Sequence, residues 1–166
     1  MPHMNNQPSR KNLRIKHYDY SGAGCYFITI CVKDNQEVLS RIDVGANCVR
    51  PTLSNYGEIV DKEIQTLSTI YEQINIDHYV IMPNHIHMLI LIEASGRTQF
   101  APTVSRVVKQ FKGSVTKQIG HSIWQKSFHD HVVRNEEDYL SIWKYIDENP
   151  AKWAEDCYYK SNPTID

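Results

Sequence analysis

Two histidines, His85 and His87, stand two residues apart in the apolar run HIHMLILI, residues 85–92. Such a run predicts a buried β-strand, in which side chains two residues apart point to the same face. Ile86, Met88 and Ile90 then point to the other face and can anchor the strand in the core. Two imidazoles side by side suit a divalent metal that keeps open positions for phosphate oxygens. At this stage two structural histidines remain the alternative.

One competing motif is the set of three alternating histidines found in nucleotide hydrolases of the histidine-triad type. The third position of that pattern is occupied here by Leu89. The hydrolase interpretation therefore lacks its nucleophile.

A second candidate group lies in WKYIDENP, residues 143–150, near the end of a predicted helix. Tyr145 projects from the flank of the apolar stripe, and Asn149 follows four residues later on the same face. If this face lies above His85 and His87, Asn149 can complete a three-ligand metal site and Tyr145 can attack a phosphodiester. A phenol with a pKa of about 10 needs a nearby cation and in-line geometry for that attack. Tyr139, the rival nucleophile, occupies the apolar stripe and is expected to pack.

These residues must be positioned by a mixture of strands and helices without strict alternation, for which an α+β sandwich is the simplest architecture. Strands are predicted at residues 26–32, 77–82 and 85–92, with an extended stretch at 123–134. Helices are predicted at residues 56–71, 103–120 and 136–149, the last two capped by Thr103 and Asn135. Residues 33–52 carry no assignable pattern. We expect a basic arm at residues 1–17, a main domain at 18–150 and a packed tail at 151–166.

The net charge of −1 hides an uneven distribution. Residues 97–134 hold seven basic residues against one acid, and the helix predicted at 103–120 carries its cations mostly off the apolar stripe. One basic face is enough to bind a polyanion, although a mixed solvated surface is the alternative. The expected DNA contacts are Arg14, Lys16, Arg106, Lys109, Lys112 and Lys117.

Bulk features favour a cytoplasmic protein. The sequence has no apolar stretch of the kind found in signal peptides or membrane spans. Its four cysteines show no CxxC spacing, which favours free thiols in a reducing compartment.

Together the segments HYVIMPNHIHMLI (78–90), SRVVKQFKGSVTK (105–117) and IWQKSFHDHVVRNEEDYLSIWKYIDENPAKW (123–153) resemble the REP-associated tyrosine transposases. These are relatives of the single-tyrosine HUH transposases of small bacterial insertion sequences. The resemblance covers roughly residues 10–160. It implies a ferredoxin-like or RRM-like fold, an antiparallel sheet with helices on one face and the two histidines on a central strand.

The same resemblance implies a set of site residues. The metal ligands fall on His85, His87 and Asn149, where insertion-sequence relatives often have glutamine at the last position, and the nucleophile falls on Tyr145. The implied reaction cuts single-stranded DNA at hairpin-forming, REP-like repeats and leaves a 5′-phosphotyrosine link and a free 3′-hydroxyl. Mg²⁺ or Mn²⁺ would serve as the metal.

Three functional hypotheses follow from these residues. The first is an active nuclease and transposase, which the intact set of four site residues favours. The second is a domesticated module that binds hairpin DNA without cutting it, and the third is a metal-dependent phosphodiesterase that uses water. A monomer is favoured, and a dimer with a shared active site remains the alternative.

Overall fold

The computed structural model describes residues 23–43, 50–93 and 102–159. Its centre is a four-stranded antiparallel sheet in the order β4-β5-β1-β6. The strands are β1 (Gly24–Cys31), β4 (Ile74–Ile81), β5 (His85–Ile92) and β6 (His129–Val133). With the helices that connect them, this order is that of a ferredoxin-like α+β fold, which confirms the predicted class.

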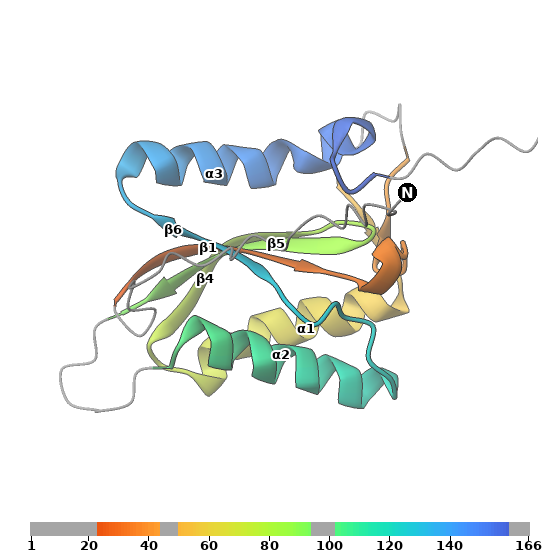
Figure 1. Ribbon diagram of the computed structural model, residues 1–166, viewed down its shortest axis with the longest axis horizontal. Coiled ribbons are helices and arrows are strands. Elements are labelled where there is room, and N and C mark those ends of the chain that lie inside the picture. Colours follow the sequence, from red (N-terminus) through yellow and green to blue (C-terminus); the bar gives the residue numbers. More distant parts are fainter. Residues whose placement is uncertain (1–22, 44–49, 94–101, 160–166) are drawn as a thin grey trace, which may run out of the picture.

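Helices cover both faces of the sheet (Figure 1). Helices α1 (Asn55–Ile70) and α2 (Val104–Ile119) pack on one face, and α3 (Glu136–Glu148) packs on the other. The expectation that all helices share one face is met by α1 and α2 alone. The separate position of α3 matters because β5 directs its histidines toward this helix.

The ends of the helices follow local capping rules. Thr103 and Asn135 each accept a hydrogen bond from the backbone three residues later, as predicted for the starts of α2 and α3. Gly120 caps the C-terminal end of α2, and its φ of 94° places it in the left-handed region that favours glycine. A short 3₁₀ segment, η2 (Asn149–Glu155), follows α3 directly and includes Pro150.

The described residues between β1 and α1, most of which fall in the stretch 33–52 without an assignable sequence pattern, form three short elements. They are η1 (Lys33–Asn35), β2 (Ser40–Arg41) and β3 (Thr52–Leu53), and the two strands pair with each other. The predicted extended stretch at 123–134 is a strand only at its end, in β6, with one isolated bridge between Val32 and Trp124.

The main core lies between the sheet and the pair α1 and α2. Ile86, Met88 and Ile90 of β5 are buried there, as the alternation predicts. A smaller apolar cluster under α3 joins Leu89 to Ile142 and Ile146. Because both faces of β5 are covered, its side chains are held rigidly. In the part of the chain described here, no helix is both long and apolar enough to cross a membrane.

Candidate functional site

The site is built around His85 and His87, which point from the central strand β5 toward the face covered by α3. Their exposed fractions are 0% and 2%, and their Nε2 atoms lie 3.0 Å apart. Burial lowers the pKa of His85 to about 3 and that of His87 well below its usual value. Both rings are therefore neutral near pH 7, which is the form that binds a metal.

A hydrogen bond on the far nitrogen fixes the tautomer of His85. Its Nδ1 lies 2.8 Å from Asn84 Oδ1, and the Asn84 amide is oriented because its Nδ2 donates to the carbonyl oxygens of Asn35 and Tyr158. The Asn84 oxygen can only accept, so His85 Nδ1 carries the proton and Nε2 keeps its lone pair. This arrangement is typical of a histidine that ligates a metal through Nε2.

His87 has a comparable partner on the neighbouring strand. Its Nδ1 lies 2.8 Å from the hydroxyl of Thr29, the residue opposite His87 in the pairing of β1 with β5. A hydroxyl can donate or accept, so this contact supports either tautomer of His87. When Nδ1 donates to Thr29, the Nε2 lone pair faces that of His85 across 3.0 Å, and a bound cation would offset the repulsion between them.

Helix α3 places Tyr145 at the same point. The Tyr145 hydroxyl lies 3.5 Å from His87 Nε2, and the side chain is 44% exposed. Phe27 of β1 contacts the tyrosine ring edge-on, with 6.1 Å between ring centroids. Burial, followed by the charges of Asp156 and Cys157, raises the pKa of Tyr145, whereas a hydrogen bond from Asn149 lowers it. The phenol is therefore protonated in the metal-free site.

Asn149 reaches the same site from the end of α3. It is 4% exposed, and its Oδ1 is buried without a hydrogen-bond partner among the described residues. Its Nδ2 donates to Asp156 Oδ2 at 3.0 Å, which turns the amide so that Oδ1 remains available. An orphaned buried acceptor is costly, and a bound cation would satisfy it.

The sequence patterns did not indicate Asp156, which enters the site from the segment after η2. Its side chain is 2% exposed, and Oδ2 lies 3.9 Å from His85 Nε2. His85, His87 and Asp156 each contribute one potential ligand atom, and these three atoms lie within 4.8 Å of one another. Because the imidazoles are neutral, the contact between Asp156 and His85 is not an ion pair. The donors of this group are those that Mg²⁺, Mn²⁺ or Zn²⁺ accept.

Aromatic residues of the C-terminal segment, residues 149–159, also pack against the site. The Tyr158 ring lies 4.5 Å from the His85 ring, and Trp153, which is 3% exposed, lies 6.0 Å from it. Beside the site is an open cavity of about 310 Å³. It is lined by Tyr145, Glu148, Asn149, Lys152, Glu155, Asp156 and Cys157. The cavity gives solvent access to the tyrosine hydroxyl.

The structure therefore brings together the four residues predicted for the site, His85, His87, Tyr145 and Asn149, within one chain. Tyr139 does not compete with them. Its hydroxyl donates to Asp77, and that hydrogen bond raises the pKa of Tyr139 to about 12.

The four expected DNA contacts on α2 lie away from the histidines. Helix α2 packs on the sheet face opposite the histidines, and Arg106, Lys109 and Lys117 are exposed on it. Lys112 is half-buried and donates to the carbonyl oxygens of Gln125 and Ser127, at 2.9 and 3.0 Å, so it ties α2 to the following loop. Arg14, Lys16 and Cys48 lie outside the described residues. Cys25, Cys31 and Cys157 are free thiols.

Comparisons with known proteins find relatives in sequence and in structure. No model of a known protein family matches the chain. A Haemophilus influenzae protein without assigned function is 33% identical over 171 residues, covering 90% of this chain and 93% of that protein. Another protein of that organism, provisionally named a REP-associated tyrosine transposase, is 25% identical over 151 residues, covering 81% of this chain and 74% of the relative.

A solved structure has a similar fold. It is that of a REP-associated tyrosine transposase bound to a REP hairpin, with a TM-score of 0.62 and 21% identity over 84% of this chain and 74% of the other. A third relative, a REP-associated tyrosine transposase of Escherichia coli, is 31% identical over 77 residues, covering 46% of this chain and 44% of that protein. The chain is thus similar in sequence and in fold to REP-associated tyrosine transposases.

Proposed function

We propose that the protein is a metal-dependent nuclease and strand transferase for single-stranded DNA, which cuts beside a hairpin through a 5′-phosphotyrosine link at Tyr145. One observation carries the proposal. The Tyr145 hydroxyl lies 3.5 Å from His87 Nε2, beside two neutral imidazoles and a carboxylate. The similar solved transposase is bound to a REP hairpin, which supports hairpin DNA as the substrate class.

The ligand set would comprise the Nε2 atoms of His85 and His87, the Asp156 carboxylate and Asn149 Oδ1. The unpartnered, buried Asn149 Oδ1 is the observation that favours a cation here over a purely structural cluster. These groups would hold Mg²⁺ or Mn²⁺, which would supply positive charge at the phosphodiester and favour the phenolate of Tyr145. Of the two glutamates that line the same cavity, Glu148 is paired with Lys152 at 2.7 Å and with Lys144 at 3.6 Å, so the carboxylate of Glu155 is the one that adds to the attraction for a cation.

In the cleavage step, the Tyr145 oxygen forms a bond to phosphorus while the bond from phosphorus to the 3′ oxygen breaks. The phenol proton passes to water, and the departing 3′ oxygen takes a proton from water to become a hydroxyl. The 5′ phosphate then remains as an ester of Tyr145. Attack on this ester by a 3′-hydroxyl reverses the step, so rejoining consumes no nucleotide cofactor. Phe27 and the α3 backbone hold the tyrosine ring in place, which lowers the entropic cost of the in-line geometry.

The test uses the full chain, Mn²⁺ and an oligonucleotide that carries a hairpin with single-stranded flanks. After denaturing electrophoresis, we expect a covalent protein–DNA adduct in the wild type and in Tyr139→Phe, and none in Tyr145→Phe. Tyr139→Phe is the matched control because it removes a hydroxyl from the same helix. Cleavage that survives in Tyr145→Phe would assign the nucleophile to water. Hairpin binding without any cleavage in the wild type would favour the domesticated binding module.

A further inference from the structure

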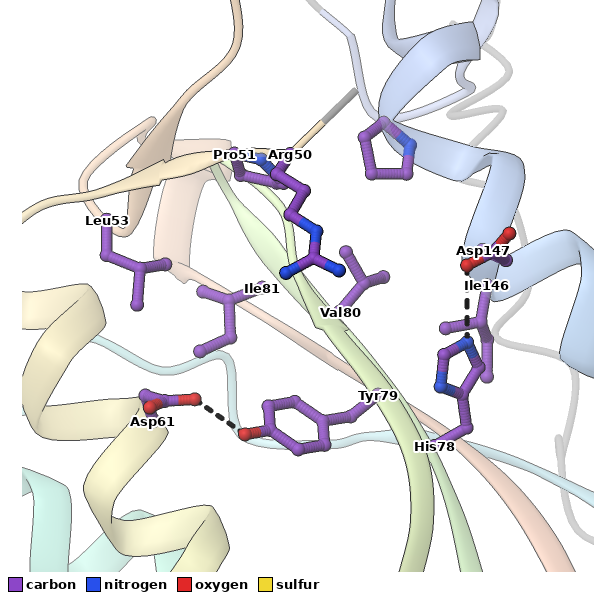
Figure 2. Close-up of a pocket in the computed structure, with 11 residues that line it drawn as sticks. Arg50, Pro51, Leu53, Asp61, His78, Tyr79, Val80, Ile81, Ile146 and Asp147 are labelled. Atoms are coloured by element: carbon purple, nitrogen blue, oxygen red, sulfur yellow. Dashed lines mark hydrogen bonds and ion pairs between the residues drawn. The ribbon is translucent and has the colours of Figure 1, made fainter. Parts of the chain in front are cut away.

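A second cavity lies on the other flank of the C-terminal end of α3, around the edge strand β4 (Figure 2). Its volume is about 390 Å³. It is lined by Arg50, Pro51, Leu53, Asp61, His78, Tyr79, Val80, Ile81, Ile146, Asp147 and Pro150. Residues from β3, α1, β4 and α3 thus meet here, and none of them takes part in the proposed cleavage step.

The cavity holds one available cation. The Arg50 guanidinium points into the space beside Val80 and Ile81 (Figure 2). Within residues 23–43, 50–93 and 102–159, no carboxylate oxygen lies within 4.0 Å of it. A guanidinium presents donors in a planar fork that matches two adjacent acceptors. Arg50 is therefore placed to bind a ligand with such a pair of acceptors.

The two acids of the cavity differ in their availability. Asp61 accepts hydrogen bonds from the Tyr79 hydroxyl at 2.6 Å and from Gln65 at 2.7 Å, so both of its oxygens are occupied. The Asp147 side chain is 63% exposed, and its one recorded contact is with His78 Nε2 at 3.9 Å. Asp147 is thus the carboxylate that remains able to accept hydrogen bonds from a ligand.

Apolar side chains separate these two polar groups. Val80 lies between Arg50 and Asp147, Ile146 lies beside Asp147, and Leu53 and Ile81 lie on the other side of Arg50 (Figure 2). A flat ligand that packs on these apolar side chains needs an edge with two acceptors for the arginine and an edge with donors for the carboxylate. Guanine has both, since O6 and N7 accept and N1 and N2 donate, whereas adenine places an amino donor beside N7 and pyrimidines lack N7.

We propose that this cavity binds one unpaired guanine of the DNA strand, with Arg50 on its O6/N7 edge and Asp147 on its N1/N2 edge. The inference rests on the proposed function, because it takes single-stranded DNA as the substrate. It adds a base-specific contact to a reaction centre that otherwise contacts phosphate.

The location connects this base site to the nucleophile. Tyr145, Glu148 and Asn149 line the cavity at the metal site, and the intervening Ile146 and Asp147 line the guanine cavity. A strand held at Tyr145 can therefore place a nearby nucleotide across the end of α3. At the rim, the Trp143 ring stacks on His78 at 4.0 Å and 8° and is 39% exposed, which offers the next base a stacking platform.

The test is fluorescence anisotropy of labelled 12-mers at low salt, with the full chain and no added metal. The oligonucleotides are all-thymine, or thymine with one central guanine, adenine or hypoxanthine, which lacks the N2 amino group. We expect the wild type to prefer the guanine oligonucleotide over all-thymine by about 5- to 150-fold, the range for one good bidentate contact. Arg50→Gln should abolish this preference, and Asp147→Ala should abolish the distinction between guanine and hypoxanthine.

Arg41→Gln is the matched control, because it removes the same charge from a side chain that is 78% exposed and outside the cavity. It should weaken binding to all four oligonucleotides equally or leave it unchanged. The inference is overturned if the wild type shows no guanine preference, if the preference over all-thymine survives in Arg50→Gln, or if Asp147→Ala still distinguishes guanine from hypoxanthine. Because this assay measures binding without cleavage, an absent adduct with an intact guanine preference refutes the proposed cleavage and leaves the cavity assignment standing.

Discussion

Asp156 offers the sharpest perturbation of the proposed metal site. Its carboxylate is 2% exposed and accepts hydrogen bonds from Asn149 Nδ2 at 3.0 Å and from the Tyr158 backbone nitrogen at 2.8 Å. Asp156→Asn keeps the size of the side chain and removes the charge. In the metal-free protein, the loss of one acceptor is offset by the relief of a buried anion, so we expect stability to change by less than about 1 kcal/mol.

The metal-bound protein should respond very differently. Loss of a group that only supports a ligand weakens metal binding about 10- to 100-fold, and loss of a direct ligand should cost at least that much. At a metal concentration 100 times Kd, binding stabilises a protein by about 2.7 kcal/mol, which falls to about 0.4–1.4 kcal/mol after such a loss. For a chain of this size, the Tm increase should drop from roughly 8 °C to roughly 1–4 °C.

Differential scanning calorimetry with EDTA or Mn²⁺, together with titration calorimetry for the affinity, measures both quantities. Glu155→Gln is the matched control, because it neutralises an exposed carboxylate that lines the same cavity. It should retain most of the Mn²⁺ effect. Equal Mn²⁺ stabilisation in the wild type and in Asp156→Asn would refute the assignment of Asp156 as a ligand, whatever the variant does to DNA cleavage.

Three other predictions address the fold and the histidines. Gly57→Ala should destabilise the protein by about 1–3 kcal/mol or more in urea unfolding, because the new Cβ would lie 2.1 Å from the backbone oxygen of Leu39. Gly113→Ala is the control: its new Cβ would have no other atom within 4 Å, so the change should be neutral or stabilising by up to about 1 kcal/mol. Equal effects of the two substitutions would refute the packing argument. Burial lowers the pKa of His85 in the folded protein to about 3, so as the pH falls this histidine is protonated in the unfolded chain before it is protonated in the folded protein. The free energy of unfolding of the metal-free protein should therefore decrease between about pH 6.5 and pH 3, by at most roughly 5 kcal/mol. The decrease should be smaller in His85→Gln, and a wild type whose stability does not depend on pH would contradict the argument. Thr29→Val should fold normally yet bind Mn²⁺ about 10- to 100-fold more weakly in titration calorimetry, because His87 loses the hydrogen-bond partner of its Nδ1. Unchanged Mn²⁺ affinity would show that the Thr29 hydroxyl does not orient the His87 ring.

The sequence predicted most of what periodicity and capping control. Strand β5 begins at His85 and ends at Ile92, as the apolar run indicates, and the helices end within a residue or so of the predicted positions. Alternation along β5 correctly placed both imidazoles on one side and Ile86 on the other. Helical spacing correctly placed Asn149 beside Tyr145. These features depend on local geometry, which a single sequence contains.

Other features depend on contacts between distant segments and carried no local signal. Asn84 orients the His85 ring only because its amide meets carbonyl oxygens of residues 35 and 158. The basic side chains of α2 were predicted to contact DNA from their charge alone, and charge does not indicate on which face of the sheet a helix packs. Resemblance to a family named the nucleophile and the ligand positions, yet it did not indicate Asp156.

The position of Asp156 has a consequence for the order in which the site forms. Its segment must fold back over β5 before the carboxylate reaches His85, and Trp153 and Tyr158 hold it there by packing around the same ring. The neutral histidines and the unpartnered Asn149 oxygen are then buried at a free-energy cost that a bound cation would offset. Metal binding should therefore stabilise the docking of residues 149–159 as well as the phosphodiester contact, so that the metal couples closure of the C-terminal segment to assembly of the active site.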